Sequence, residues 1–222
     1  MTQEEWPARL ANRVAQEVRR HRERRDMSAQ DLADACKALG LSFSRSAIAN
    51  FESGRRPTIS VAELTVLGKA LDVPPIELVF PVGYQEEVEV LPGHELPAWT
   101  ALKWFAGEEP FGRRFPDDGK IWVQKQEEFE ESATFAFRWH QTYTKQCMEA
   151  ADQVKAARRA AGAAESEGER NGHLAHARTE EAQYRMCRML LREHRARMRR
   201  DGLTPPGLWG VLADVDDKGE AS

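Results

Sequence analysis

Apolar residues recur at helical spacing through the first 80 positions of this 222-residue chain. Leu10, Val14 and Val18 repeat every four residues, which predicts a helix over residues 8–25. Three further apolar repeats each follow a serine that can cap a helix, and these serines are Ser28, Ser44 and Ser60. A proline pair then opens a short fifth helix. The pattern therefore predicts one all-α domain of five helices, residues 1–83.

Residues 84–122 have a different character. Val88 and Val90 alternate with polar residues only briefly, and a short helix around Leu102 is expected. Aromatic side chains are dense in this stretch, namely Tyr84, Trp99, Trp104, Phe105, Phe111, Phe115 and Trp122. Because free linkers lack such side chains, we predict an ordered connector that packs on one or both of its neighbours.

The second half of the chain carries a 3.5-residue repeat, which is the period of a left-handed coiled coil. Its members follow one another at spacings of four and three, and they are Phe129, Ala133, Ala136, His140, Tyr143, Cys147, Ala150, Val154, Ala157 and Ala161. Glycines interrupt the repeat near residue 167, and a return helix follows. We predict a long antiparallel helical hairpin over residues 123–203 that dimerises the protein, closed either within or between chains. Residues 204–222 are predicted to be a partly disordered tail.

The net charge of −4 is the balance of alternating basic and acidic segments. Residues 1–60 carry 11 basic and 8 acidic side chains, and residues 132–200 carry 14 and 8. Residues 61–131 carry 6 basic and 15 acidic side chains, and residues 201–222 carry 1 and 5. Salt screens exposed charges beyond about 10 Å, so a nucleic acid responds to the segment it meets. The total charge therefore does not exclude DNA as a partner.

A basic stripe follows the predicted return helix and consists of Arg185, Arg188, Arg192, Arg195 and Arg199. It is either a second nucleic-acid surface or one side of a set of ion pairs. The candidate partners across the hairpin are Glu127, Glu128, Glu130 and Glu131. We favour pairing, because charges beside a coiled-coil seam usually set its register.

Several classes of protein do not fit this sequence. No segment approaches the ~18 apolar residues that span a bilayer, and the N-terminal residues show no secretory signal. The three cysteines form no CxxC pair, so we expect a cytoplasmic protein. The hairpin sets two cysteines and two histidines opposite each other. However, His140 and Cys147 lie roughly 10 Å apart along their helix, too far for one ion. With no catalytic motif present, we expect no enzyme activity, metal or cofactor.

The second and third predicted helices have the arrangement of a helix-turn-helix, in which the later helix enters the major groove of DNA. The candidate DNA-binding residues are Ser28, Gln30, Ser44, Arg45, Ser46, Asn50, Arg55 and Arg56. Arg45 can pair with guanine O6 and N7, and Asn50 can pair with adenine N6 and N7. Free N–H groups at the start of the third helix face phosphate, and Arg55 and Arg56 are placed for backbone contacts.

Three blocks of sequence resemble the lambda-repressor/Cro type of helix-turn-helix, often called the XRE family. These are residues 28–33 (SAQDLA), 46–57 (SAIANFESGRRP) and 64–73 (LTVLGKALDV). Glu52, Gly54 and Arg56 carry the sharpest part of the resemblance, which covers about residues 8–80. It implies a five-helix lambda-repressor-like domain that binds double-stranded DNA.

The leading hypothesis is a sequence-specific transcriptional regulator, most simply a repressor, that reads the major groove as a homodimer. The alternative is a protein-interaction module, with a toxin or a phage or host component as its partner, whose helix-turn-helix domain autoregulates its own operon. A ligand sensor with a pocket in the aromatic-rich stretch, residues 97–122, is a third possibility. No membrane partner is expected.

Overall fold

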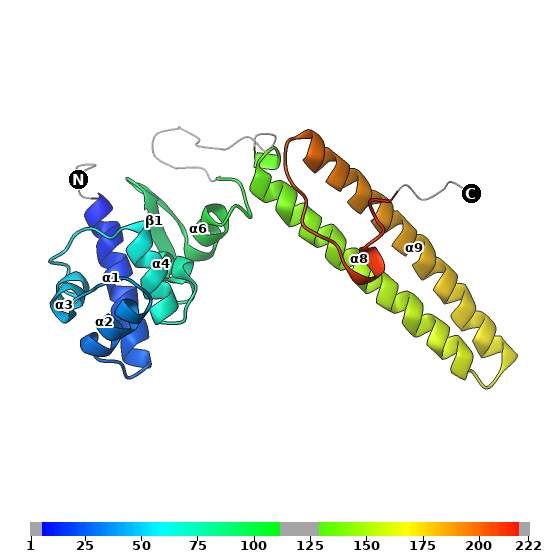
Figure 1. Cartoon of the computed structure of the whole chain (residues 1–222), viewed down its shortest axis with the longest axis horizontal. Coiled ribbons are helices and arrows are strands. Elements are labelled where there is room, and N and C mark those ends of the chain that lie inside the picture. The colour runs from blue at the N-terminus through cyan, green and yellow to red at the C-terminus, as the bar shows by residue number, and fades with distance from the viewer. Residues whose placement is uncertain (1–5, 112–128, 218–222) are drawn as a thin grey trace. The chain divides into compact units, whose positions relative to one another are not determined.

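A computed structural model of the protein describes residues 6–111 and 129–217 (Figure 1). The chain divides into two compact units, Met1–Val123 and Gln124–Ser222. Each of them has its own cluster of buried apolar residues.

The N-terminal unit begins with five short helices, as the apolar pattern predicts. They are α1 (Trp6–Arg24), α2 (Ala29–Ala38), α3 (Arg45–Glu52), α4 (Val61–Ala70) and α5 (Pro75–Val79). Ser28, Ser44 and Ser60 precede α2, α3 and α4, and each hydroxyl accepts a hydrogen bond from a backbone N–H of the first turn. The starts of these helices are therefore set by local chemistry that is visible in the sequence.

A two-stranded hairpin and a sixth helix complete this unit. Strand β1 (Glu87–Leu91) pairs antiparallel with β2 (His94–Pro97), and α6 (Ala98–Phe105) follows directly. The mainly helical architecture is confirmed, but the hairpin is not part of the prediction. Its strands have five and four residues, and only Val88 and Val90 signal alternation, so the local pattern is too short to be decisive.

Several residues in the described part of the aromatic stretch belong to the core of the helical unit, whereas Tyr84, Trp99 and Phe105 are exposed. Val88, Leu96, Ala101 and Phe111 are buried in one cluster with residues of α1 to α5. Arg9 on α1 also donates to Glu89 on β1 at 2.7 and 2.6 Å. The hairpin is thus fastened to the first helix by both packing and an ion pair.

The C-terminal unit is a helical hairpin of α8 (Ala133–Ala163) and α9 (Glu167–Arg200), which pack along their length within one chain (Figure 1). Many members of the predicted repeat are buried in the seam, including His140, Cys147 and Ala157. They meet Cys187, Leu191 and other residues of α9. Small side chains at the seam let two long helices approach closely.

The tail corrects one prediction. Its residues are ordered as far as Asp217, with a short 3₁₀ helix, η2 (Gly210–Leu212). Leu212 and Val215 are buried against Cys147 and Leu191 in the core of the hairpin. The apolar residues of this segment, among them Leu208, Val211, Leu212 and Val215, follow neither a helical nor a strand period, so the sequence predicts a partly disordered tail. The final residues, 218–222, lie outside the described part of the chain.

Candidate nucleic-acid interface

The connection between α2 and α3, residues 39–44, is held by a glycine turn and a buried aromatic ring. Gly40 has a positive φ of 91°, and the N–H of Leu41 donates to the carbonyl of Cys36 at 3.0 Å. This is the Schellman pattern that closes a helix at a glycine. The Phe43 side chain is buried in the core. The connection therefore sets α3 in a defined place after α2.

Helix α3 has one apolar face and one polar face. Ile48 and Phe51 are buried in the core, whereas Arg45, Ser46 and Asn50 are exposed. The spacing of the two sets follows the helical period, so the polar side chains share the outward face. Three of the predicted DNA-binding residues are thus brought together on one surface.

The start of α3 offers backbone donors. Ser44 accepts a hydrogen bond from the N–H of Ala47 at 3.0 Å, and its hydroxyl lies 2.9 Å from that of Ser46. The N–H groups of Arg45 and Ser46 precede the first hydrogen bond within the helix. An anion at this end is favoured by those donors and by the helix dipole.

Ser28 and Gln30 lie at the start of α2, where both are exposed. Ser28 forms a capping box with Asp31, and its two hydrogen bonds are 3.1 and 2.7 Å long. Hydrogen bonds from the backbone and the side chain of Ser28 to the carboxylate lower the pKa of Asp31. The Gln30 amide donates to Asp34 at 3.0 Å. The first role of Ser28 is therefore to begin α2, while Gln30 presents its side chain beside an acidic neighbour.

Arg55 and Arg56 are adjacent in sequence but differ in their surroundings. Arg56 donates to Glu63 at 2.6 Å, and its guanidinium lies 5.7 Å from the centre of the Phe43 ring. Partial burial of Glu63 acts to raise its pKa, but hydrogen bonds from Ser60 and Arg56 act the other way. Together they leave the pKa of Glu63 below its ordinary value. Arg55 is exposed, and no partner is seen for it among the described residues. Of the two, Arg55 is the one available to a phosphate.

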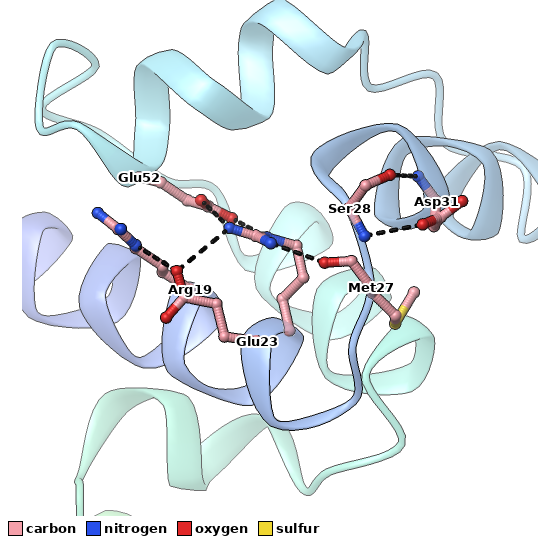
Figure 2. A network of polar contacts seen from close by, with 7 residues as sticks. Arg19, Glu23, Met27, Ser28, Asp31 and Glu52 are labelled. Atoms are coloured by element: carbon pink, nitrogen blue, oxygen red, sulfur yellow. Dashed lines mark hydrogen bonds and ion pairs between the residues drawn. The ribbon is translucent and has the colours of Figure 1, made fainter.

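An ion pair that the sequence did not reveal joins α1 to α3, and its arginine also bonds to the segment before α2 (Figure 2). Arg22 near the end of α1 donates to both oxygens of Glu52 on α3, each at 2.7 Å, and to the carbonyl of Met27 before α2. The side chains are 12% and 9% exposed. The hydrogen bonds that Arg22 donates to Glu52 raise the pKa of Arg22 despite partial burial. Arg22 thereby fixes the end of α3 relative to α1 and to the start of α2.

Residues 13–79 match the family model of a helix-turn-helix domain. The matched segment runs from within α1 to the end of α5 and contains every predicted DNA-binding residue. No curated protein and no solved structure matches the chain. The geometry of α2, its turn and α3 agrees with this family, whose second helix enters the major groove of DNA.

Within the helix-turn-helix domain, Gly54 is required by shape. It has a φ of +73°, and a Cβ at this position would lie 2.8 Å from Oδ1 of Asn12 on α1. Glu52 and Arg56, the other two residues that carry the family resemblance most clearly, form ion pairs with Arg22 and Glu63. These three residues hold α3 and the following loop in place, and the outward residues of α3 remain for recognition.

Four of the five arginines of the basic stripe on α9 pair with the tail, namely Arg188, Arg192, Arg195 and Arg199. Arg195 donates to Asp216 at 2.8 and 2.7 Å, and Arg188 lies 2.9 Å from Asp214. The other partners in this set are Val215, whose carbonyl accepts from Arg192, and Asp216, which also accepts from Arg199. Charge pairing was predicted, but with glutamates before α8. Two of those, Glu127 and Glu128, lie outside the described residues.

The buried histidine and cysteines of the hairpin do not assemble a metal site. Arg195 donates to Nε2 of His140 at 2.7 Å, so the imidazole must be neutral there. Burial raises the pKa of Cys147 to about 12, and nearby Cys187 adds to that shift. Over residues 6–111 and 129–217, no three His, Cys, Asp or Glu side chains are grouped to hold an ion. Among the described helices, none has the length and apolarity to cross a membrane.

Proposed function

We propose that this protein is a cytoplasmic transcriptional regulator of the XRE type that binds specific DNA sequences as a homodimer and represses transcription. The observation that carries this proposal is the outward face of α3. Arg45, Ser46 and Asn50 lie exposed on it, while the residues around them are occupied in holding the helix. No catalytic role is proposed for any residue.

The side chains on that face differ in the bases they suit. Arg45 can donate two hydrogen bonds to guanine O6 and N7, and the Asn50 amide can do the same kind of pairing with adenine. Each well-formed pair discriminates by about 1–3 kcal/mol against a wrong base. The N–H groups at the start of α3 and the guanidinium of Arg55 provide phosphate contacts that set the register.

A single copy of this surface is small. Helix α3 has eight residues, roughly 12 Å of helix, and so reaches only a few base pairs. Residues 1–60 carry a modest excess of basic side chains, which limits the number of phosphate contacts. Two copies bound to half-sites about 34 Å apart would double both the number of base pairs reached and the number of phosphate contacts. A dimer bound across a promoter then excludes other proteins from it, which is the simplest route to repression.

The test is a titration of the full chain against duplexes selected from a random library, with a scrambled duplex as competitor. Arg45→Ala should weaken binding to the selected sequence by about ten- to a hundredfold and leave binding to the scrambled duplex nearly unchanged. Arg178→Ala, an exposed arginine on α9, is the matched control and should change neither. Equal affinity of the unaltered protein for all duplexes would overturn the proposal.

A second candidate function is a protein-interaction module with autoregulation. It is favoured by large apolar side chains exposed on the C-terminal unit, among them Phe137, Met148 and Trp209. Purification from the native host separates the two functions, because a stoichiometric second protein would support the module and a homodimer alone would support the simple regulator.

A further inference from the structure

A groove of about 980 Å³ runs along α8 of the C-terminal unit. One wall is α8 itself, and the other is the extended segment over residues 206–209. Phe137, Met148 and Trp209 line it, and Trp209 is 71% exposed. Large apolar side chains that gather on one exposed surface usually mark a place where another molecule binds.

The wall formed by the tail is held firmly in place. Arg195 donates to the carbonyl of Pro206 at 2.6 Å, and the hydroxyl of Tyr184 donates to the carbonyl of Val211 at 2.9 Å. Leu212 is buried in the hairpin core just beyond. Trp209 is therefore presented at the rim of the groove by residues anchored on both sides of it, rather than by a loose tail.

The α8 wall carries a second helical stripe. Phe137, Gln141, Thr144 and Met148 follow one another at spacings of four, three and four, each one position after a residue of the α8–α9 seam. This is the spacing of a face that packs against another helix. Helix α9 occupies the neighbouring stripe, so the stripe in the groove is available to a further helix.

Charges along the groove change sign from one end to the other. Arg138 and Lys145 line its N-terminal part along α8, and Glu149 and Asp152 line its C-terminal part. An antiparallel copy of the same face presents these charges in the opposite order. Such an arrangement is complementary to itself, as the interface of a two-fold dimer must be.

We propose that the groove binds the same face of a second copy of this chain, with the two α8 helices antiparallel about a two-fold axis near residue 144. Phe137 of one copy then lies near Met148 of the other, and Arg138 lies near Asp152. Trp209 closes over the partner helix. The choice of a second copy rests partly on the proposed dimeric regulator, but the self-association is measured without DNA.

The first experiment measures the mass of the full chain in solution by light scattering over a range of micromolar concentrations. The unaltered protein should have twice the chain mass. Met148→Glu should raise the dissociation constant of the dimer by about thirtyfold or more, because a charge is buried at the centre of the interface. Met186→Glu is the matched control on α9, where the methionine is similarly exposed, and it should remain dimeric.

The second experiment exchanges charges. Arg138→Glu and Asp152→Arg should each weaken the homodimer, whereas an equimolar mixture of the two variants should form a heterodimer, because each unlike pair is then restored. Asp152 lies 3.4 Å from Lys155 on its own helix, an exposed contact that contributes little.

A monomeric unaltered protein would overturn the inference, as would a dimer that survives Met148→Glu, or a mixture no more associated than the single variants. The proposed function fails differently, through a lack of sequence preference in a protein that still dimerises. Met148→Glu leaves α3 intact. If this variant loses affinity for a duplex with two half-sites but keeps weak binding to a single half-site, the dimer in the groove is the one that binds DNA.

Discussion

The two units use arginine for different structural ends. In the N-terminal unit, Arg22 crosses from α1 to Glu52 on α3 and so holds short helices around one core. In the C-terminal unit, Arg195 and its neighbours on α9 hold a short tail against a long hairpin. The comparison shows that an arginine-rich segment is not in itself a DNA-binding surface. Arg45 and Arg55 differ because no partner is seen for either among the described residues.

The units also differ in what stabilises them. The N-terminal helices are short, and isolated helices of that length are marginal in water, so caps and interhelical pairs are needed. The C-terminal helices have 31 and 34 residues and share a continuous seam, but that seam buries His140 and Arg195. Disruption of one ion pair should therefore matter most in the first unit, and protonation should matter most in the second.

The largest effect is expected from Arg22→Ala. Removal of the guanidinium leaves the largely buried carboxylate of Glu52 without its partner, which should cost about 3 kcal/mol of unfolding free energy. Hydrogen exchange followed by mass spectrometry should show this loss over α1 to α3 in the full chain. Arg19→Ala removes an exposed arginine that pairs with Glu23 on the same helix, and it should leave the unfolding free energy nearly unchanged. Equal losses of stability in Arg22→Ala and Arg19→Ala would contradict the stabilising role of the Arg22–Glu52 pair.

The next effect concerns acid and the C-terminal unit. Burial, with Arg195 and His194 nearby, lowers the pKa of His140 to about 4. Because unfolded His140 takes up a proton below its ordinary pKa of 6.5, its contribution to stability is complete above pH 6.5 and is lost as the pH falls towards 4. The loss should reach up to about 3 kcal/mol at the acid end.

Urea unfolding followed by circular dichroism at pH 7 and pH 5 measures this slope. His140→Gln should flatten the slope, whereas His176→Gln, an exposed histidine on α9, should keep it. The same slope in all three proteins would count against the assignment. Asp216 does not add to this window. The hydrogen bond from Arg195 holds the pKa of Asp216 below 3.8, so its contribution is lost only at more acid pH.

The smallest effect concerns Gly54, in the loop that follows α3. Gly54→Ala must place a Cβ at positive φ and against Asn12, whereas Gly40→Ala has the positive φ but an open space. The first should cost about 2 kcal/mol and the second about 1 kcal/mol in thermal unfolding. Adding Asn12→Ala should bring the cost of Gly54→Ala down to that of Gly40→Ala. If the cost does not fall, contact with Asn12 is not the reason that position 54 requires glycine.

Much of the candidate site could be predicted from spacing alone. The serine caps, the buried Ile48 and the outward Arg45 depend on residues within a few positions of one another. The different surroundings of Arg55 and Arg56 could not be predicted, because Glu63 becomes a partner only when the loop brings it back. The role of Arg22 was hidden in the same way within a run of arginines at the end of α1.

The sequence by itself determined the helices, where they begin, and which face of each is apolar, because these follow from side chains repeated every three or four residues. Only the tertiary structure decided which charges are occupied. Arg22 meets Glu52 across 30 positions, and Arg195 meets Asp216 across 21. Such pairs depend on how whole elements pack, and no local period records them. The same reason explains why Leu212 and Val215, silent in the sequence, complete the core of the hairpin.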